Sequence, residues 1–299
     1  MPNPTHATLI GLIAIVLWSA IVGLIRSVSD HLGPTGGAAM LYSVASCFLL
    51  LTVGGARPRD LRAFPQRYLL WGSVLFVAYE LCLALSIGYA HTAQQAIEVG
   101  MVNYLWPSFT IVAAIVFNRQ RANWLIVPGF GLSIIGIGWV LGGERGVDLA
   151  GMLENVQDNP LSYGLAFSGA LIWAAYCAVT ARMAEGKNGI TLFFMLTALA
   201  LWGKFLVGGG GGMHWSVPTV IQLALAAAAM GFGYAAWNVG ILHGNVTILA
   251  GASYFIPVLS ASLAAVLLRV PLPASFWIGA FMVCGGAILC WLATRGRAA

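Results

Sequence analysis

Almost the whole chain consists of apolar segments that are each about as long as a lipid bilayer is thick. Hydrophobic residues make up 60% of the sequence and charged residues only 8%, whereas about a quarter of a soluble protein is charged. A helix needs roughly 17–25 apolar residues to cross the hydrocarbon core. The sequence therefore predicts an all-α integral membrane protein with ten transmembrane helices, at residues 7–25, 36–55, 68–90, 93–117, 122–142, 161–183, 190–207, 218–242, 246–268 and 273–293.

The Lys and Arg residues between these segments are unevenly distributed. Ten of the fourteen fall on the side of the N-terminus if every segment crosses the membrane. Positive residues gather on the cytoplasmic side of membrane proteins, so we expect both termini to face the cytoplasm. Anionic lipid beside basic loops accounts for the net charge of +5. The lipid bilayer is therefore an expected partner, and no nucleic acid is needed to explain the charge.

Two regions of the chain match each other at a spacing of 150 residues. Identical residues recur at this offset, among them Tyr104 and Tyr254, Pro107 and Pro257, Gly129 and Gly279, and Gly136 and Gly286. We therefore predict two five-helix repeats, residues 1–143 and 161–299, joined by a periplasmic linker at 144–160. Repeats with an odd number of spans must insert in opposite orientations, as in many secondary transporters.

Pro107 and Pro257 occupy the middle of corresponding spans. A proline in a membrane helix frees a carbonyl group and permits a kink. Because the proline recurs in both repeats, we interpret the pair as hinges or gates. The alternative is that prolines are simply frequent in membrane helices.

The longest loop, residues 142–160, is acidic. A short surface helix around residues 149–156 is one interpretation of it. A solvated linker between the two repeats is the interpretation that we favour.

Glu80 and Glu98 are the two acidic residues within the predicted spans. Acidic side chains at this depth are costly and often functional. At the repeat offset they correspond to Met230 and Ile248, so neither acid is repeated. Each has three interpretations: a ligand for the ammonium group of an amino acid, a proton-coupling site, or a buried acid hydrogen-bonded to a neighbouring helix.

Aromatic and amide side chains recur at mid-span positions. A cavity walled by rings would stack on a planar substrate and attract a cation through its π faces. For any single ring, lipid contact or core packing is the alternative, and a mid-span amide can instead join helices. The predicted substrate-binding set is Trp18, Tyr79, Glu80, Glu98, Asn103, Tyr104, Trp173, Tyr176, Tyr234, Trp237, Ser253 and Tyr254.

Other chemistry has little support in the sequence. The five cysteines lie in spans without metal-ligand spacing, and no G-x-x-x-x-G-K-[ST] phosphate loop is present. We expect no metal, no cofactor and no enzymatic activity. A membrane enzyme or a structural bundle is a third hypothesis, which we rank below two hypotheses of transport. No feature of the sequence predicts an oligomeric state.

The two predicted repeats resemble the drug/metabolite transporter superfamily of the EamA type. Each repeat ends on a glycine-patterned helix, PGFGLSIIGIGWVLGG (128–143) and GAFMVCGGAILCWL (279–292). The stretch EVGMVNYLWPSFTIVAAIVFNRQRANWLIVPGFGL (98–132) looks like the bacterial aromatic amino acid exporters of this superfamily. The resemblance implies export of aromatic, and as a wider possibility other neutral, amino acids across the bacterial inner membrane. The inverted repeats predict that this transport proceeds by alternating access. The alternative is export of aromatic cations or drugs.

Overall fold

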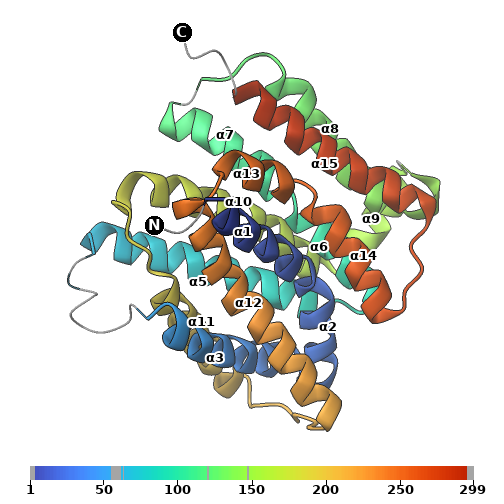
Figure 1. The fold of residues 1–299 in the computed structure, drawn as a ribbon. Helices are drawn as coiled ribbons and strands as arrows, with labels where there is room; N and C mark the ends of the chain where they lie inside the picture. Colours follow the sequence, from blue (N-terminus) through green and yellow to red (C-terminus); the bar gives the residue numbers. More distant parts are fainter. Residues whose placement is uncertain (1–3, 55–61, 63, 120, 147, 295–299) are drawn as a thin grey trace.

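The described part of the protein, residues 4–54, 62, 64–119, 121–146 and 148–294 of a computed structural model, is all-helical and contains no strand (Figure 1). The α-helices are α1 (Pro4–Ser19), α2 (Ile21–Leu32), α3 (Pro34–Thr52), α5 (Gln66–Gly88), α6 (Ala93–Asn103), α7 (Trp106–Asn118), α8 (Ile126–Leu141), α9 (Leu149–Asp158), α10 (Pro160–Met183), α11 (Ile190–Val207), α12 (Val217–His243), α13 (Val246–Ser253), α14 (Ile256–Leu268) and α15 (Ala274–Thr294). A short 3-10 turn, η1 (Gly143–Arg145), follows α8.

The helices are long and apolar enough for a membrane protein. Seven segments of the described chain meet the length and composition needed to cross a bilayer, one of them α6 and α7 together. An eighth is added if α1 and α2, which are bent by 41° at Ala20, form one span. Two further apolar helices, α8 and α14, are shorter, with 16 and 13 residues. The prediction of an all-α membrane protein is confirmed at this level.

Each of the two repeated prolines begins a helix after a break. Tyr104 and Leu105 separate α6 from α7, and Pro107 is the second residue of α7. Pro257 is likewise the second residue of α14. A proline is well placed in a first turn, because its missing N–H would find no partner within the helix there. The break at Ala20 between α1 and α2 has no proline.

A helix occupies the loop for which the sequence favoured a solvated linker. The carboxylate of Asp148 accepts a hydrogen bond from the backbone N–H of Ala150 and caps the start of α9. Leu149 and Leu153 are 76% and 58% exposed, whereas Met152 and Val156 pack against the core. The segment thus has one core-facing side, and that side explains why it is helical.

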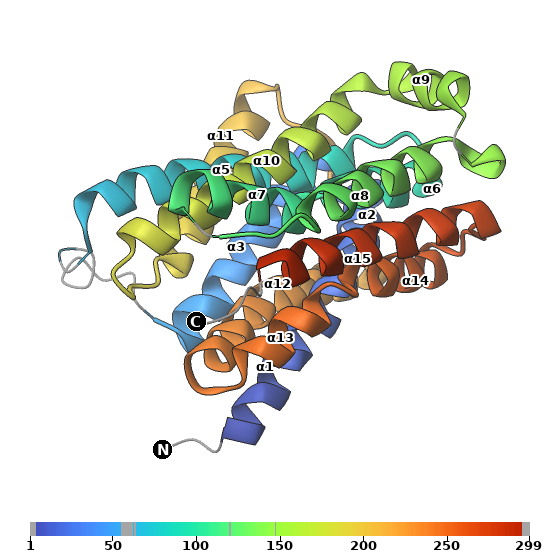
Figure 2. The ribbon, with the colours of Figure 1, turned by 90° about the horizontal axis from the view of Figure 1, so that it is seen from above.

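Glycines bring α8 and α15 into close contact along their length (Figure 2). A Cβ atom added to Gly129 would lie 2.8 Å from the backbone nitrogen of Cys290, and one added to Gly136 would lie 2.8 Å from the carbonyl oxygen of Gly279. Side chains at these positions would push the two backbones apart. The glycines of α8 and α15 therefore permit the close approach of these two helices.

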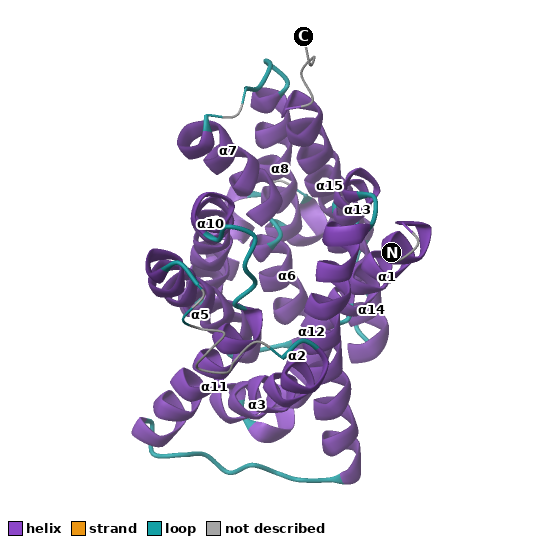
Figure 3. Ribbon diagram, turned by 60° about the vertical axis from the view of Figure 1, so that its left-hand side comes forward, coloured by secondary structure: helices purple, strands orange, loops and turns teal. Residues whose placement is uncertain are grey.

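The remaining helices pack in pairs from distant parts of the chain. α1 packs along α12, α5 along α10, and α3 along α11. Figure 3 shows α5 and α10 on one side of the molecule, and α12, α13 and α14 on the other. The cavity described next lies between these two sides.

Candidate substrate cavity

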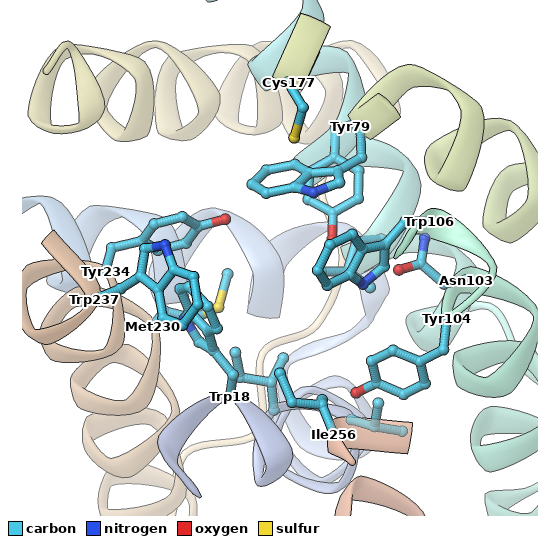
Figure 4. A pocket seen from close by; sticks show the side chains of 14 residues that line it. Trp18, Tyr79, Asn103, Tyr104, Trp106, Cys177, Met230, Tyr234, Trp237 and Ile256 are labelled. Carbon is cyan, nitrogen blue, oxygen red and sulfur yellow. The ribbon is translucent and has the colours of Figure 1, made fainter. Parts of the chain in front are cut away.

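A cavity of about 190 Å³ lies in the interior, among residues of the helices α1, α2, α5, α6, α7, α10, α12 and α14. Its wall includes residues next to the break between α1 and α2, the break between α6 and α7, and the start of α14. Figure 4 shows its side chains. The lining residues are Trp18, Ile21, Val22, Tyr79, Leu83, Asn103, Tyr104, Trp106, Trp173, Cys177, Met230, Tyr234, Trp237 and Ile256.

Aromatic rings form two facing walls of the cavity. On one wall, the Trp173 ring centroid lies 4.5 Å from that of Tyr79 and 6.0 Å from that of Trp106. On the other wall, the Trp18 ring lies 5.0 Å from Tyr234 and 5.2 Å from Trp237. Figure 4 shows Tyr79 and Trp106 opposite Tyr234 and Trp237. These separations are those of interacting ring pairs.

The lining carries no charged side chain. Seven of its fourteen residues are Trp or Tyr, which combine apolar faces with O–H or N–H donors. Asn103 adds an amide, whose Nδ2 donates to the backbone carbonyl of Ala166 at 3.2 Å. Such a lining suits a small solute with an apolar ring and a few polar atoms.

Seven of the twelve predicted site residues line the cavity. They are Trp18, Tyr79, Asn103, Tyr104, Trp173, Tyr234 and Trp237. The other five lie elsewhere and are described next: Glu80, Glu98, Tyr176, Ser253 and Tyr254.

Glu80 is fully buried behind the cavity wall. Its Oε2 accepts a hydrogen bond from the Tyr42 hydroxyl of α3. Its Oε1 accepts one from the Tyr234 hydroxyl of α12 at 2.9 Å. Both carboxylate oxygens are thus bonded to tyrosines of other helices, which corresponds to the hydrogen-bonded interpretation of this acid.

Glu98 is also bonded within the protein. Gln94 Nε2 donates to its Oε1, and the Tyr163 hydroxyl donates to its Oε2, both at 2.9 Å. Near it, Asp158 Oδ2 accepts from Gln95 Nε2 at 2.9 Å and pairs with His91 Nδ1 at 3.0 Å. The hydrogen bond from Gln95, followed by that from His91, holds the pKa of Asp158 below its ordinary value.

The remaining three predicted residues pack beside the cavity or away from it. The Tyr176 ring lies 5.4 Å from Phe76 and 5.2 Å from Trp173, behind the first aromatic wall. Ser253 Oγ donates to the carbonyl of Ala250 at 2.8 Å. The Tyr254 ring packs at 6.0 Å from Trp291 of α15.

Several lining residues were not in the predicted set. Trp106 begins α7, so its place beside a repeated break was the signal that would have found it. Met230 corresponds to Glu80 at the repeat offset, and Cys177 lies one turn from Trp173. The aliphatic members, Ile21, Val22, Leu83 and Ile256, have no chemical signal in the sequence that separates them from other membrane residues.

Fold and cavity together define a multi-pass helical membrane protein with an internal site for a small solute. The EamA-like transporter family matches residues 160–292. The chain is 61% identical to the "Aromatic amino acid exporter YddG" of Salmonella typhimurium (strain 14028s / SGSC 2262) over 97% of its own length and 98% of the relative. The protein of the same name from Escherichia coli (strain K12) is also 61% identical, with the same coverage. The chain therefore belongs to the EamA-like transporter family, together with these exporters, and is a transporter rather than an enzyme.

More distant proteins extend the comparison. The "Aromatic amino acid exporter YddG" of Ancylobacter novellus is 26% identical over 97% of this chain and 99% of the relative. A solved crystal structure aligns with a TM-score of 0.68 at 24% identity, covering 98% of this chain and 99% of the other. That likeness shows the fold.

Proposed function

We propose that the protein exports aromatic amino acids by alternating access, through the cavity described above. The observation that carries the proposal is the pair of aromatic walls, together with the aromatic amino acid export for which relatives 61% identical over nearly the whole chain are named. Stacking on Trp and Tyr faces favours a substrate with a planar ring. The O–H, N–H and amide groups of the lining are available for the polar end of the substrate.

The uncharged lining favours a zwitterion over a permanent cation. An amino acid carries no net charge, so its ammonium group can face a ring while its carboxylate accepts hydrogen bonds. A permanent cation would gain from a carboxylate, but both oxygens of Glu80 are bonded to Tyr42 and Tyr234. Export of aromatic cations remains the second candidate, because ring faces attract them as well.

For the architecture, we propose ten spans in two inverted repeats, 1–143 and 161–299, with the segment 144–160 on the periplasmic side. The described helices support a repeat at the offset of 150. α6 ends at Asn103 and α13 at Ser253, whereas α7 begins at Trp106 and α14 at Ile256. Both α7 and α14 end before an arginine in the left-handed conformation, Arg119 and Arg269.

Helix packing supports the same symmetry. Under the repeat, α1 and α2 correspond to α10, and α5 corresponds to α12. The proposed symmetry therefore relates the pair α5 and α10 to the pair α12 and α1. In each pair, the two helices pack along their length. Two pairs correspond to themselves, α3 with α11 and α8 with α15, and these also pack together.

The cavity lies between two bundles that exchange under this symmetry. The first bundle is α5, α6, α7 and α10, and the second is α1, α2, α12, α13 and α14. The lining residues divide equally between them, seven from each. Rocking of one bundle against the other would open the cavity to alternate sides.

The two bundles meet at the outer end, which we define as the end where α2 and α5 finish. There α2 contacts α5 and α6, and α14 contacts α6. The Arg26 guanidinium donates to the carbonyl of Ala90 across the interface, and Arg26 pairs with Asp30 at 2.9 Å. The inner halves α1 and α13 pack against each other within the second bundle. This arrangement supports an inward-facing state, with Pro107 and Pro257 at the hinges between outer and inner halves.

We further propose that the protein lies in the bacterial inner membrane with both termini in the cytoplasm. Its support is the excess of Lys and Arg on the side of the N-terminus and the bacterial source of the relatives. In Figure 2 the start of α1 and the end of α15 lie toward the same end of the molecule, opposite α9.

Flux into liposomes tests the proposal. Purified protein is reconstituted and offered radiolabelled tryptophan, with and without an imposed pH gradient. Saturable tryptophan flux that methyl viologen, an aromatic dication, does not inhibit is the expected result. Methyl viologen flux without tryptophan flux would favour the cation exporter instead. A tryptophan flux that the pH gradient drives would indicate proton coupling. A flux that the pH gradient leaves unchanged would indicate a facilitator.

A further inference from the structure

Glu80 lies one residue from the cavity lining without being part of it. Tyr79 before it and Leu83 after it both line the cavity, whereas Glu80 points into the protein and is 0% exposed. Its two oxygens are bonded to Tyr42 and Tyr234. Because Glu80 is fully buried behind the cavity wall, a substrate ammonium group in the cavity has no exposed carboxylate oxygen to bind. A direct role in binding therefore has no geometric support.

Tyr234 is the side chain through which Glu80 reaches the cavity. Its ring lies 5.0 Å from Trp18 on its own wall and 6.5 Å from Trp173 on the facing wall. Its hydroxyl is fixed by the carboxylate of Glu80. A buried hydroxyl that loses its partner is left with an unmet hydrogen bond, so it would move toward another polar group. The ring of Tyr234 would turn with it and change the shape of the cavity.

The bond between Glu80 and Tyr234 also crosses from one bundle to the other. Glu80 belongs to α5 of the first bundle and Tyr234 to α12 of the second. Tyr42 anchors the same carboxylate to α3, outside both bundles. Glu80 thus joins three helices at the level of the cavity.

The second repeat provides an internal comparison. At the offset of 150, Glu80 corresponds to Met230, Tyr42 to Leu192, and Tyr234 to Ala84. The matching place in the other repeat is entirely apolar, and that repeat folds without the polar trio. The scaffold itself therefore does not require the carboxylate, which points to a task specific to this side of the cavity.

We propose that Glu80 is a positioning residue for transport, which sets affinity for aromatic substrates by holding the hydroxyl of Tyr234. This inference deepens the proposed function and rests on it. Glu80→Met, which introduces the residue of the counterpart position, is expected to raise the KM for tryptophan about fivefold or more, with a smaller change in maximal rate. Glu80→Gln, which keeps one carbonyl oxygen and can donate to the second tyrosine, is expected to recover part of that affinity.

A double-mutant cycle separates this role from direct contact. Tyr234→Phe removes the hydroxyl that Glu80 holds, so Glu80→Met added to it should change the KM little further. If Glu80 contacts the substrate itself, its substitution would raise the KM equally with and without the Tyr234 hydroxyl, and the inference would be overturned. Tyr42→Phe, which leaves the bond to Tyr234 in place, should raise the KM less than Tyr234→Phe.

A second variant and the wild-type protein allow the test to be decided if Glu80→Met does not fold or if transport is absent. If Glu80→Met does not fold, the cycle is run with Glu80→Gln, whose equal effect in both backgrounds would overturn the inference as well. Tryptophan flux by the wild-type protein tests the proposed function separately. Its absence would overturn that function, whereas a failed cycle with intact wild-type flux would overturn only the role of Glu80.

Discussion

The ring of Trp173 lies close to rings on both walls of the cavity. Its centroid lies 4.5 Å from Tyr79, 6.0 Å from Trp106 and 6.5 Å from Tyr234, so it touches rings of both bundles. A substrate ring that enters the cavity must pack against this side chain or displace one of its neighbours. Trp173 is therefore the residue whose loss should affect aromatic substrates most.

We expect Trp173→Leu to weaken tryptophan transport through affinity. Loss of one ring pair is worth about 0.5–1.5 kcal/mol, which predicts a roughly two- to tenfold rise in KM. The measurement is concentration-dependent flux in liposomes. Phe167→Leu on the same helix, where the side chain is 44% exposed on the outside, is the matched control and should leave the KM unchanged. Equal effects of the two substitutions would contradict a role for the cavity rings.

At the scale of single residues, the sequence indicated which types of side chain line the cavity better than it indicated which side of a helix faces the cavity. Mid-span position was enough to select Trp18, Trp173 and Tyr234. It failed for Tyr254, which corresponds to Tyr104 but packs on Trp291. Helices in this protein are apolar on nearly all sides, so periodicity does not reveal which side faces a cavity. Only the packing of neighbouring helices decides that.

Among the elements, α8 and α15 show how glycine sets the distance between helices. A Cβ atom at Gly286 would lie 2.3 Å from Ser133 Oγ and 2.6 Å from the carbonyl oxygen of Gly129. At the neighbouring Gly285, the nearest atom would be a side-chain carbon of Leu132 at 3.6 Å. Two adjacent glycines thus differ sharply in the space around them.

We predict that Gly286→Ala destabilises the protein and Gly285→Ala does not. Overpacking of a tight contact costs about 1–3 kcal/mol, which should appear as a lower Tm in detergent. Ordinary van der Waals contact at Gly285 should leave the Tm close to that of the wild type. A similar Tm for both variants would show that the α8 and α15 interface yields more readily than the structure indicates.

The breaks in the helices were only partly predictable. Prolines in the sequence pointed to the middle of two spans, and the structure has α7 and α14 begin there. The break at Ala20, with its bend of 41°, has no proline to mark it. The helix α9 was the less favoured of two interpretations of its segment, because its core-facing side is only two residues wide, Met152 and Val156.

At the scale of the whole molecule, the outer contact between the bundles is the feature on which the proposed alternating access depends. A Cβ atom at Gly100 of the first bundle would lie 3.7 Å from the Cβ of Val22 in the second. Disulfides join Cβ atoms about 3.8 Å apart. This pair therefore provides a reversible lock for the outer end.

We expect the double variant Val22→Cys with Gly100→Cys to lose tryptophan flux on oxidation and to regain it on reduction. The lock would hold the bundles together at the outer end, so the cavity could not open on that side. Each single-cysteine variant and the wild type serve as controls, and oxidation should leave the flux of each of them unchanged. Full transport by the cross-linked protein would contradict the gate assigned to this end.

The central claim is that tryptophan occupies the cavity between the bundles, and a native thiol there allows a direct measurement. Cys177 lines the cavity, whereas Cys47 is exposed elsewhere on the protein. Site-resolved mass spectrometry can follow the alkylation of both thiols by a small maleimide in the unmodified chain. The account predicts that tryptophan slows alkylation of Cys177 in proportion to its saturation of transport and leaves Cys47 unaffected. Saturable tryptophan flux with no protection of Cys177 would place the substrate elsewhere and contradict the account.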